Sequence, residues 1–243
     1  MSGSHLALQY TRVPFLLLNC ICDQVSCTSP TPPPEAKTRE TYDANLETRD
    51  PPGFVSFFGP FRKSLTVAMN LIEIYVILVG VYPKIRFPIF DPIMPRPPSN
   101  GIRISSYFVI GSLLFYLGTI IRLLSYRAMG RHFTFHLTIL PNHKLITTGP
   151  YSIVRHPSYT AVNMVFLAME LCELGSGSWL RESFMRTSSG AFLGIAWGVM
   201  VASLAVIILR RIPKEDAILR KEFKGQWDSW AEKTPYKLIP FIY

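Results

Sequence analysis

Residues 149 to 159 read GPYSIVRHPSY and bring several groups that can bind an anion into one short stretch. Arg155 can hold a carboxylate with two parallel hydrogen bonds. Pro157 restricts His156 and can open a helix, which would leave His156 and the local backbone amides at a helix N-terminus that favours anions. The alternatives are a lipid-headgroup anchor for Arg155 and a hydrogen-bonded interfacial role for His156. The pattern predicts an anion-binding site at these two residues.

A second polar cluster, RRIPKED, occupies residues 210 to 216 directly after an apolar run. Arg211 and Glu215 lie four residues apart, with Pro213 between them. The proline predicts that a membrane helix ends here or that the next one begins. As a surface ion pair the two side chains would contribute a fraction of a kcal/mol. As a site, Arg211 would bind a substrate carboxylate and Glu215 would accept hydrogen bonds from cofactor hydroxyls or an amino group.

The apolar residues, 49% of the 243, are concentrated in runs that are predicted to be long enough to cross a bilayer. Mean hydropathy is +0.23. The sequence predicts an all-α, polytopic membrane helix bundle with about four to five transmembrane helices, a cytosolic cofactor site and a C-terminal amphipathic helix. The expected spans are 6–22, which is the weakest, 65–82, 106–126, 159–174 and 190–209.

The segments between these runs are rich in proline, charge or histidine. A proline-rich, exposed linker is expected from 26 to 52, and the prolines between 83 and 103 exclude a continuous helix. After residue 209 the apolar spacing predicts one amphipathic helix with a stripe of Ile218, Leu219, Phe223, Trp227 and Trp230. We divide the chain into an N-terminal helix and linker (1–64), transmembrane helices (65–126) and the motif region (127–243).

The net charge of +9 and pI of about 9.5 could indicate a nucleic-acid partner. The basic residues flank apolar runs, however, which favours loop bias and anionic lipid over nucleic acid. If all five runs cross the membrane, 17 Lys and Arg residues lie on one side and 7 on the other. The side with more basic residues holds both polar clusters, and it is predicted to face the cytosol.

Other titratable residues predict less chemistry. The spacing of Cys20, Cys22, Cys27 and Cys172 argues against zinc and favours free thiols in a reducing compartment, with lipid attachment as the weaker alternative. Glu73 is expected to be hydrogen-bonded within the bundle. The sequence contains no dinucleotide, P-loop or zinc-protease motif, so a nucleotide-like cofactor would need a different kind of site.

Residues 143 to 159, HKLITTGPYSIVRHPSY, are followed by a predicted helical hairpin, Arg211-x-x-x-Glu215, Phe223-x-x-x-Trp227 and PYKLIP at 235–240. In motifs and order, residues 105 to 243 resemble the isoprenylcysteine carboxyl methyltransferases. The resemblance implies methylation of the C-terminal carboxylate of prenylated cysteine in CaaX-processed proteins, with S-adenosylmethionine as cofactor. It also implies a multi-pass protein of the endoplasmic reticulum membrane.

The same resemblance implies site residues. Arg211 and Arg155 would bind the substrate carboxylate. The family often has glutamine at the position of His136, so that one contact transfers less directly than the others. The implied cofactor-binding residues are His136, His143, Lys144, Leu145, Ile146, Tyr151, His156, Pro157, Ser158, Tyr159 and Glu215.

Three alternatives remain open at this level. Phospholipid N-methyltransferases resemble the same motif, but an amine needs a base and gains little from two arginines. Sterol reductases have a related Arg-His-Pro-x-Tyr sequence and use a nicotinamide cofactor, but they usually have more spans. A non-enzymatic membrane scaffold would bind no S-adenosylmethionine and would tolerate loss of Arg211.

Overall fold

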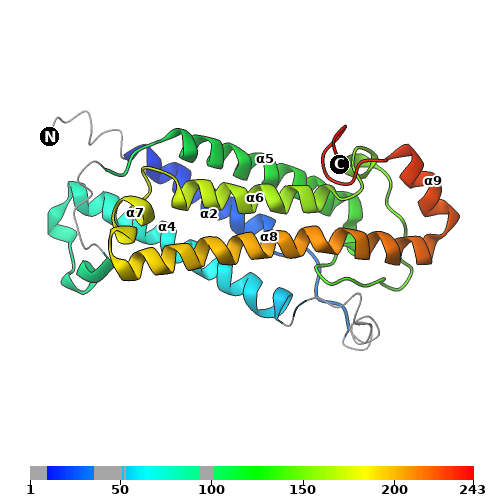
Figure 1. Ribbon diagram of the computed structural model, residues 1–243, viewed down its shortest axis with the longest axis horizontal. Coiled ribbons are helices and arrows are strands. Elements are labelled where there is room, and N and C mark those ends of the chain that lie inside the picture. The colour runs from blue at the N-terminus through cyan, green and yellow to red at the C-terminus, as the bar shows by residue number, and fades with distance from the viewer. Residues whose placement is uncertain (1–9, 36–50, 52, 94–100) are drawn as a thin grey trace. The chain divides into compact units, whose positions relative to one another are not determined.

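The computed structural model describes residues 10–35, 51, 53–93 and 101–243, and all regular elements in these ranges are helical. This confirms the predicted all-α fold class. Short π- and 3-10 turns and the four-residue helix α7 (Trp179–Glu182) connect the longer helices. The longer helices are α2 (Arg12–Ser26), α4 (Gly59–Val81), α5 (Ser106–Met129), α6 (Pro157–Leu174), α8 (Ser188–Phe223) and α9 (Gly225–Lys233) (Figure 1).

Three helical segments in the described ranges are long and apolar enough to cross a membrane: Phe54–Val81, Ser106–His132 and Ser188–Phe223. The sequence therefore predicted more transmembrane helices, four to five, than these three candidate spans. Helix α2 has only 15 residues, and residues 6–9 of the predicted first span lie outside the described residues. Helix α6 has 18 residues, but Glu170, Glu173 and several polar side chains lower its hydropathy.

Two prolines behave differently at the helices that carry the site. Pro157 is the first residue of α6, as predicted, because an N-terminal proline loses no intrahelical hydrogen bond. The prediction for Pro213 was wrong, since α8 continues through it to Phe223. An internal proline removes one hydrogen bond. Side-chain bonds made by Glu215 and Asp216 help to hold the next turn in place.

The predicted single amphipathic helix after residue 209 is instead two helices. The chain breaks at Lys224, whose φ of 48° is not helical. Phe223 therefore ends α8, while Trp227 and Trp230 lie on α9. The apolar stripe predicted from their spacing is divided between the two helices.

The chain forms two compact units, each assembled from separate stretches. Unit 1 comprises 1–25, 62–116 and 164–203, and unit 2 comprises 26–61, 117–163 and 204–243. Helices α4, α5, α6 and α8 therefore contribute residues to both units. The predicted division of the chain at residues 64 and 126 refers to consecutive sequence segments rather than to compact units, and it stays a prediction.

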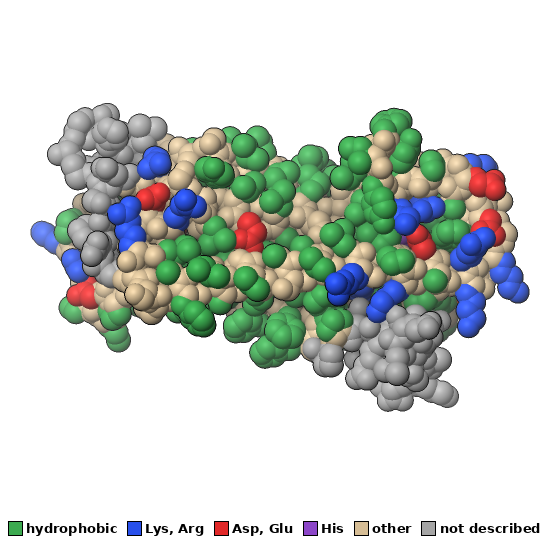
Figure 2. All heavy atoms as spheres, in the orientation of Figure 1, with side chains coloured by type: hydrophobic (Ala, Val, Ile, Leu, Met, Phe, Trp, Pro, Cys, Tyr) green, Lys and Arg blue, Asp and Glu red, His purple; other side chains and the backbone are tan. Residues whose placement is uncertain are grey.

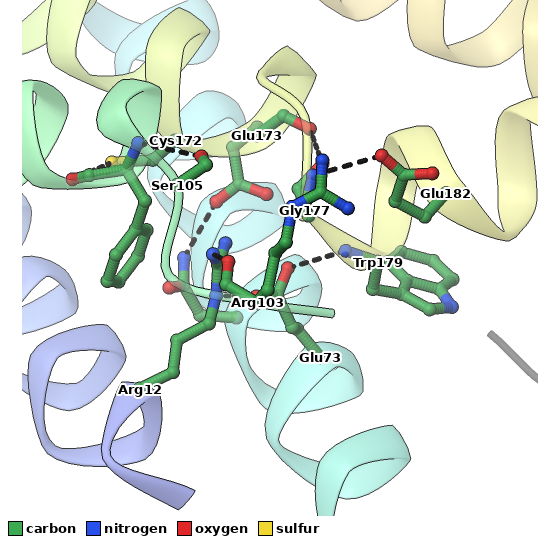
Figure 3. A network of polar contacts seen from close by, with 12 residues as sticks. Arg12, Glu73, Arg103, Ser105, Cys172, Glu173, Gly177, Trp179 and Glu182 are labelled. Atoms are coloured by element: carbon green, nitrogen blue, oxygen red, sulfur yellow. Dashed lines mark hydrogen bonds and ion pairs between the residues drawn. The ribbon is translucent and has the colours of Figure 1, made fainter. Parts of the chain in front are cut away.

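Unit 1 contains a buried polar network between its helices (Figure 3). The Glu73 carboxylate accepts hydrogen bonds from Arg12 Nε and from the backbone N–H of Trp179, the latter at 2.9 Å. Arg12 Nη1 also donates to the Arg103 carbonyl oxygen at 2.7 Å, and Asn70 donates to Glu173 at 3.1 Å. Glu73 is thus hydrogen-bonded within the bundle, as predicted.

A second buried ion pair joins Arg62 Nη1 to Asp23 Oδ1 at 2.8 Å. Arg12 and Arg62 were counted among the loop charges in the orientation argument, but both side chains are buried in unit 1. One comes from each side of that count, so the difference between the two sides is unchanged, but the count assumed five crossings and the described residues contain three candidate spans. Among the described residues, which include all four cysteines, no disulfide forms.

The Arg12–Glu73 pair gives a direct test of this network. Glu73→Gln would leave the Arg12 cation buried without its counterion, so we expect the free energy of unfolding to fall by about 3–5 kcal/mol. Equilibrium unfolding in detergent micelles measures the change.

Arg86→Gln is the matched control, because the Arg86–Asp91 pair has side chains that are 54% and 46% exposed. We expect that change to cost less than about 1 kcal/mol. The double variant Arg12→Met/Glu73→Leu should recover part of the loss. Equal effects of Glu73→Gln and Arg86→Gln would contradict the structural role of the buried pair.

Candidate active site

Unit 2 brings the first turn of α6 into contact with α8 just beyond Pro213. His156 Nε2 lies 2.9 Å from Asp216 Oδ1, and His156 Nδ1 lies 3.9 Å from Glu215 Oε1. The Tyr159 hydroxyl donates a hydrogen bond to Glu215. The His156 and Tyr159 rings stack with centroids 5.5 Å apart and planes 6° apart. The two clusters recognised in the sequence therefore meet.

Arg155 lies at one end of this cluster with a side chain that is 10% exposed. Its Nη2 is 3.6 Å from Asp216 Oδ2, and its guanidinium carbon lies 5.5 Å from the centre of the Trp227 ring. Arg155 Nε is buried and has no hydrogen-bond partner in the structure. Because a buried donor without a partner is unfavourable, this nitrogen is a candidate contact for an anionic ligand.

Arg211 lies on α8, one turn before Glu215, and is buried. Its Nη2 donates to the carbonyl oxygen of Phe135 at 2.6 Å. Its guanidinium carbon lies 5.6 Å and 5.8 Å from the ring centres of Phe54 and Tyr159. Arg211 is therefore held in place by a backbone oxygen and two aromatic rings. One of these rings belongs to Tyr159, which also contacts Glu215.

Two of the backbone amides next to the start of α6 already have partners. Arg155 N–H donates to the Tyr236 carbonyl at 2.9 Å and His156 N–H to the Lys237 carbonyl at 2.8 Å. These two amides are therefore not available to an anion, whereas the guanidinium groups remain candidates for binding one.

An apolar cluster of Tyr151, Trp227 and Trp230 lies in the same unit, with Leu145 and Ile146 packed against it. Trp230 Nε1 donates to the Tyr151 carbonyl at 3.1 Å, which ties α9 to the turn Gly149–Ser152. Burial, reinforced by the Glu215 carboxylate, raises the pKa of the Tyr151 hydroxyl far above its usual value. Tyr151 therefore stays neutral within this buried apolar cluster.

The remaining predicted cofactor residues lie at different positions in unit 2. Pro157 starts α6. The His143 ring lies 4.9 Å from that of His132 and 6.0 Å from that of Phe223, which also packs on the apolar cluster. Lys144 is exposed, and the His136 backbone N–H donates to the Thr134 hydroxyl at 3.1 Å. The contacts described for these three residues do not place them at the carboxylate pair.

Arg122, which contacts Ser158, is a residue of this region that the sequence interpretation missed. Arg122, buried in α5, donates through Nη1 to the Ser158 hydroxyl and to the Ser158 carbonyl, the latter at 2.8 Å. Its Nε donates to the Ser26 carbonyl at 3.0 Å. Arg122 thus links the end of α2 to the start of α6. An ionisable residue inside an apolar run was the available signal.

Asp216 was also missed, although it belongs to the second polar cluster. It is the one acidic residue described as contacting both Arg155 and His156. With Glu215 it forms a pair of carboxylates on the helix that also carries Arg211, and it contacts Arg155. If all four are ionised, their charges sum to zero.

The pKa of His143 provides a pH-dependent test of this part of unit 2. Burial, with the neighbouring His132 acting in the same direction, lowers the pKa of His143 from 6.5 to about 4. The unfolded chain therefore binds this proton more readily than the folded chain between these values. The contribution to stability is complete above pH 6.5 and is lost as the pH falls toward 4.

We expect the melting temperature to fall more between pH 7.5 and pH 5 in the wild type than in His143→Gln. Thermal unfolding in detergent at both pH values measures the difference. His136→Gln serves as a control and should retain the wild-type pH dependence. An unchanged pH dependence in His143→Gln would contradict the assignment.

Comparisons with known proteins confirm the resemblance to methyltransferases. Residues 106–184 match a family model described as phospholipid methyltransferase. The chain is 28% identical over 138 residues to protein-S-isoprenylcysteine O-methyltransferase B of Arabidopsis thaliana, covering 54% of this chain and 58% of that protein. It is 30% identical over 135 residues to a probable protein-S-isoprenylcysteine O-methyltransferase of Oryza sativa subsp. indica, covering 55% and 61%. The chain thus spans about three-fifths of the length of these curated relatives, and its similarity is to methyltransferases named for two different acceptors.

Proposed function

We propose that this protein transfers a methyl group from S-adenosylmethionine to the C-terminal carboxylate of a prenylated cysteine. The observation that supports the proposal is the cluster of Arg155, His156, Arg211, Glu215 and Asp216 at the junction of α6 and α8. The names of the curated relatives support the same acceptor. The cluster has both the cations needed to orient a carboxylate and the anions needed beside a positively charged donor.

The charge balance of the cluster suits this pair of ligands. The Glu215 and Asp216 side chains are 29% and 13% exposed, while Arg155 is 10% exposed. In such a partly desolvated place an unbalanced charge is unfavourable. A carboxylate and a sulfonium together add no net charge to two arginines and two acids. Either ligand alone would leave one unbalanced charge in the cluster.

The residues present fit the proposed cofactor. S-adenosylmethionine would supply a methyl group bonded to positively charged sulfur, which an anionic oxygen can attack directly. The Glu215 and Asp216 oxygens can accept hydrogen bonds from ribose hydroxyls or an amino group. The apolar cluster of Tyr151, Trp227 and Trp230 is buried, so it would support the site from behind rather than present an open face to a purine ring. His156, Pro157, Ser158 and Tyr159 would form the edge of this site on α6.

The protein's own residues would orient the reacting groups and exclude water from them. A C-terminal carboxyl group has a pKa near 3.5, so it is already an anion at neutral pH and needs no general base. Arg155 Nε and the Arg211 guanidinium would fix the carboxylate oxygen in line with the methyl carbon. Alignment of this kind contributes several kcal/mol to catalysis. A tight ion pair with one arginine would lower the reactivity of the oxygen. Weaker contacts with both arginines would orient the oxygen and leave it reactive.

The prenyl chain would reach the site through the bilayer. Each buried CH₂ contributes about 0.8 kcal/mol to membrane partitioning. Hydrophobic side chains lie on the outer faces of α5 and α8 (Figure 2), including Leu113, Leu117, Ile120, Val199 and Val206. We propose that the protein resides in the endoplasmic reticulum membrane with the site facing the cytosol, the side that carries more basic residues when all five apolar runs cross.

Methylation of a phospholipid amine is the second candidate, because the matching family model is described by that activity. An amine must lose a proton during methylation. Glu215 and Asp216 are carboxylates at the site that could accept it. The buried Arg211 and the largely buried Arg155 beside a cationic acceptor would be unfavourable, so we prefer the carboxylate acceptor.

Methylation assays in membranes distinguish the candidates. Radiolabelled S-adenosylmethionine is offered with a farnesylcysteine analogue or with phosphatidylethanolamine, and we expect label in the first acceptor alone. Label in the lipid alone would establish the second candidate. Label in neither would favour a reductase or a scaffold.

Arg211→Gln tests the role of the buried arginine. Removing a charge-assisted hydrogen bond of about 2–3 kcal/mol should lower kcat/KM for the farnesylcysteine analogue about 30- to 150-fold. Arg210→Gln is the matched control, because Arg210 is the exposed neighbour on the same turn of α8. Similar kinetics of the two variants would argue against carboxylate binding by Arg211.

A further inference from the structure

Residues 236–243, here called the closing segment, are bonded directly to the start of α6. The Tyr236 and Lys237 carbonyls accept the backbone N–H groups of Arg155 and His156. The Leu238 carbonyl accepts a hydrogen bond from the Thr160 hydroxyl at 2.7 Å. Figure 1 shows this end of the chain beside the first turn of α6. The position of the two site residues therefore depends on where the closing segment lies.

Beyond these contacts the closing segment folds into a tight turn with an apolar tip. The Tyr243 carbonyl accepts from the N–H groups of Leu238 at 2.7 Å and Ile239 at 2.9 Å. Leu238 is buried, while Phe241 is 86% exposed and Ile242 is 77% exposed. Phe241 has a φ of 65°, so the turn holds these side chains outward at some conformational cost. Two adjacent large apolar side chains in this position form an exposed apolar pair that an apolar or amphiphilic partner could cover.

The position of the turn within unit 2 indicates the partner. It is bonded to the first turn of α6, and the preceding turn Gly149–Ser152 approaches the end of α5, with an ideal Cβ at Gly149 lying 3.8 Å from Ala128 Cβ. The candidate membrane span that contains α5 ends at His132. The closing segment therefore lies at the level where a membrane-spanning helix leaves the bilayer.

The composition of the turn also fits a membrane interface. Lys237 Nζ donates to the Tyr243 hydroxyl at 3.3 Å and lies 4.9 Å from the centre of its ring. Tyrosine is enriched at the membrane–water boundary, and lysine near helix ends extends its charge toward the headgroups. Lys and Arg side chains also gather over α9 and the end of α8 (Figure 2), where anionic headgroups would attract them.

We propose that Phe241 and Ile242 insert into the lipid bilayer, and that this docking holds the Arg155–His156 backbone in its observed position. The contact makes the order of the candidate active site depend on the membrane surface. The docking itself is independent of the proposed methyl transfer. Its meaning for catalysis rests on that function.

The docking is tested with the full chain in phospholipid nanodiscs. Phe241→Trp adds one indole, and its emission is taken as the difference from the wild type. We expect that difference emission to be quenched by lipids brominated near the headgroup and to be protected from aqueous iodide. Quenching by iodide alone overturns the proposal. So does protection that varies with protein density, which would indicate a second copy, or that needs added farnesylcysteine analogue, which would indicate a substrate contact.

The coupling to the site is tested by hydrogen exchange of the Arg155 and His156 amides. In Phe241→Asp/Ile242→Asp we expect these amides to exchange at least about tenfold faster in nanodiscs, because the carbonyls that accept them are no longer held. Phe87→Asp/Ile89→Asp is the matched control, since its side chains are 59% and 80% exposed in unit 1. It should leave both amides unchanged. Unchanged exchange in the first variant, or equal acceleration in both, overturns the coupling whether or not the protein transfers methyl groups.

Discussion

The adjacent carboxylates of Glu215 and Asp216 are the constraint around which unit 2 is organised. They accept contacts from Tyr159, His156 and Arg155, so one turn of α8 fixes the whole start of α6. In a place with little water, removing one partner leaves an uncompensated charge, which is far less favourable than losing an exposed pair. The position of the start of α6 therefore depends on these contacts with Glu215 and Asp216.

The sequence was a good guide where local rules act alone. Pro157 starts a helix because its missing N–H is of no consequence there, and the apolar runs give α5 and α6 close to their observed bounds. It failed at Pro213 and Lys224. In α8 the tertiary contacts of Glu215 and Asp216 support the helix after the proline, whereas the break at Lys224 lets Trp227 and Trp230 reach Tyr151. A contact between His156 and Asp216, 60 residues apart, has no local signature.

The two units show how buried charge can serve structure or function. Glu73 is enclosed by Arg12 and the Trp179 amide, and its side chain is 2% exposed. Glu215 is bonded to one hydroxyl, and 29% of its side chain is accessible. Both are carboxylates in largely apolar helices, and the sequence alone could assign them only by their position in the run. The structure separates them by exposure, because only the Glu215 carboxylate is open to solvent.

Pro213 has a consequence for the depth at which the protein lies in a membrane. Without an N–H at residue 213, the carbonyl oxygen of Leu209 cannot receive its usual helical hydrogen bond, and hydrocarbon offers no substitute. Leu209 therefore belongs at the level of hydrated headgroups. From Ser188 to Leu209 the helix rises about 33 Å, close to the thickness of a hydrocarbon layer. The proline thus marks a depth in the membrane and places Arg211 and the acids after it at the water boundary.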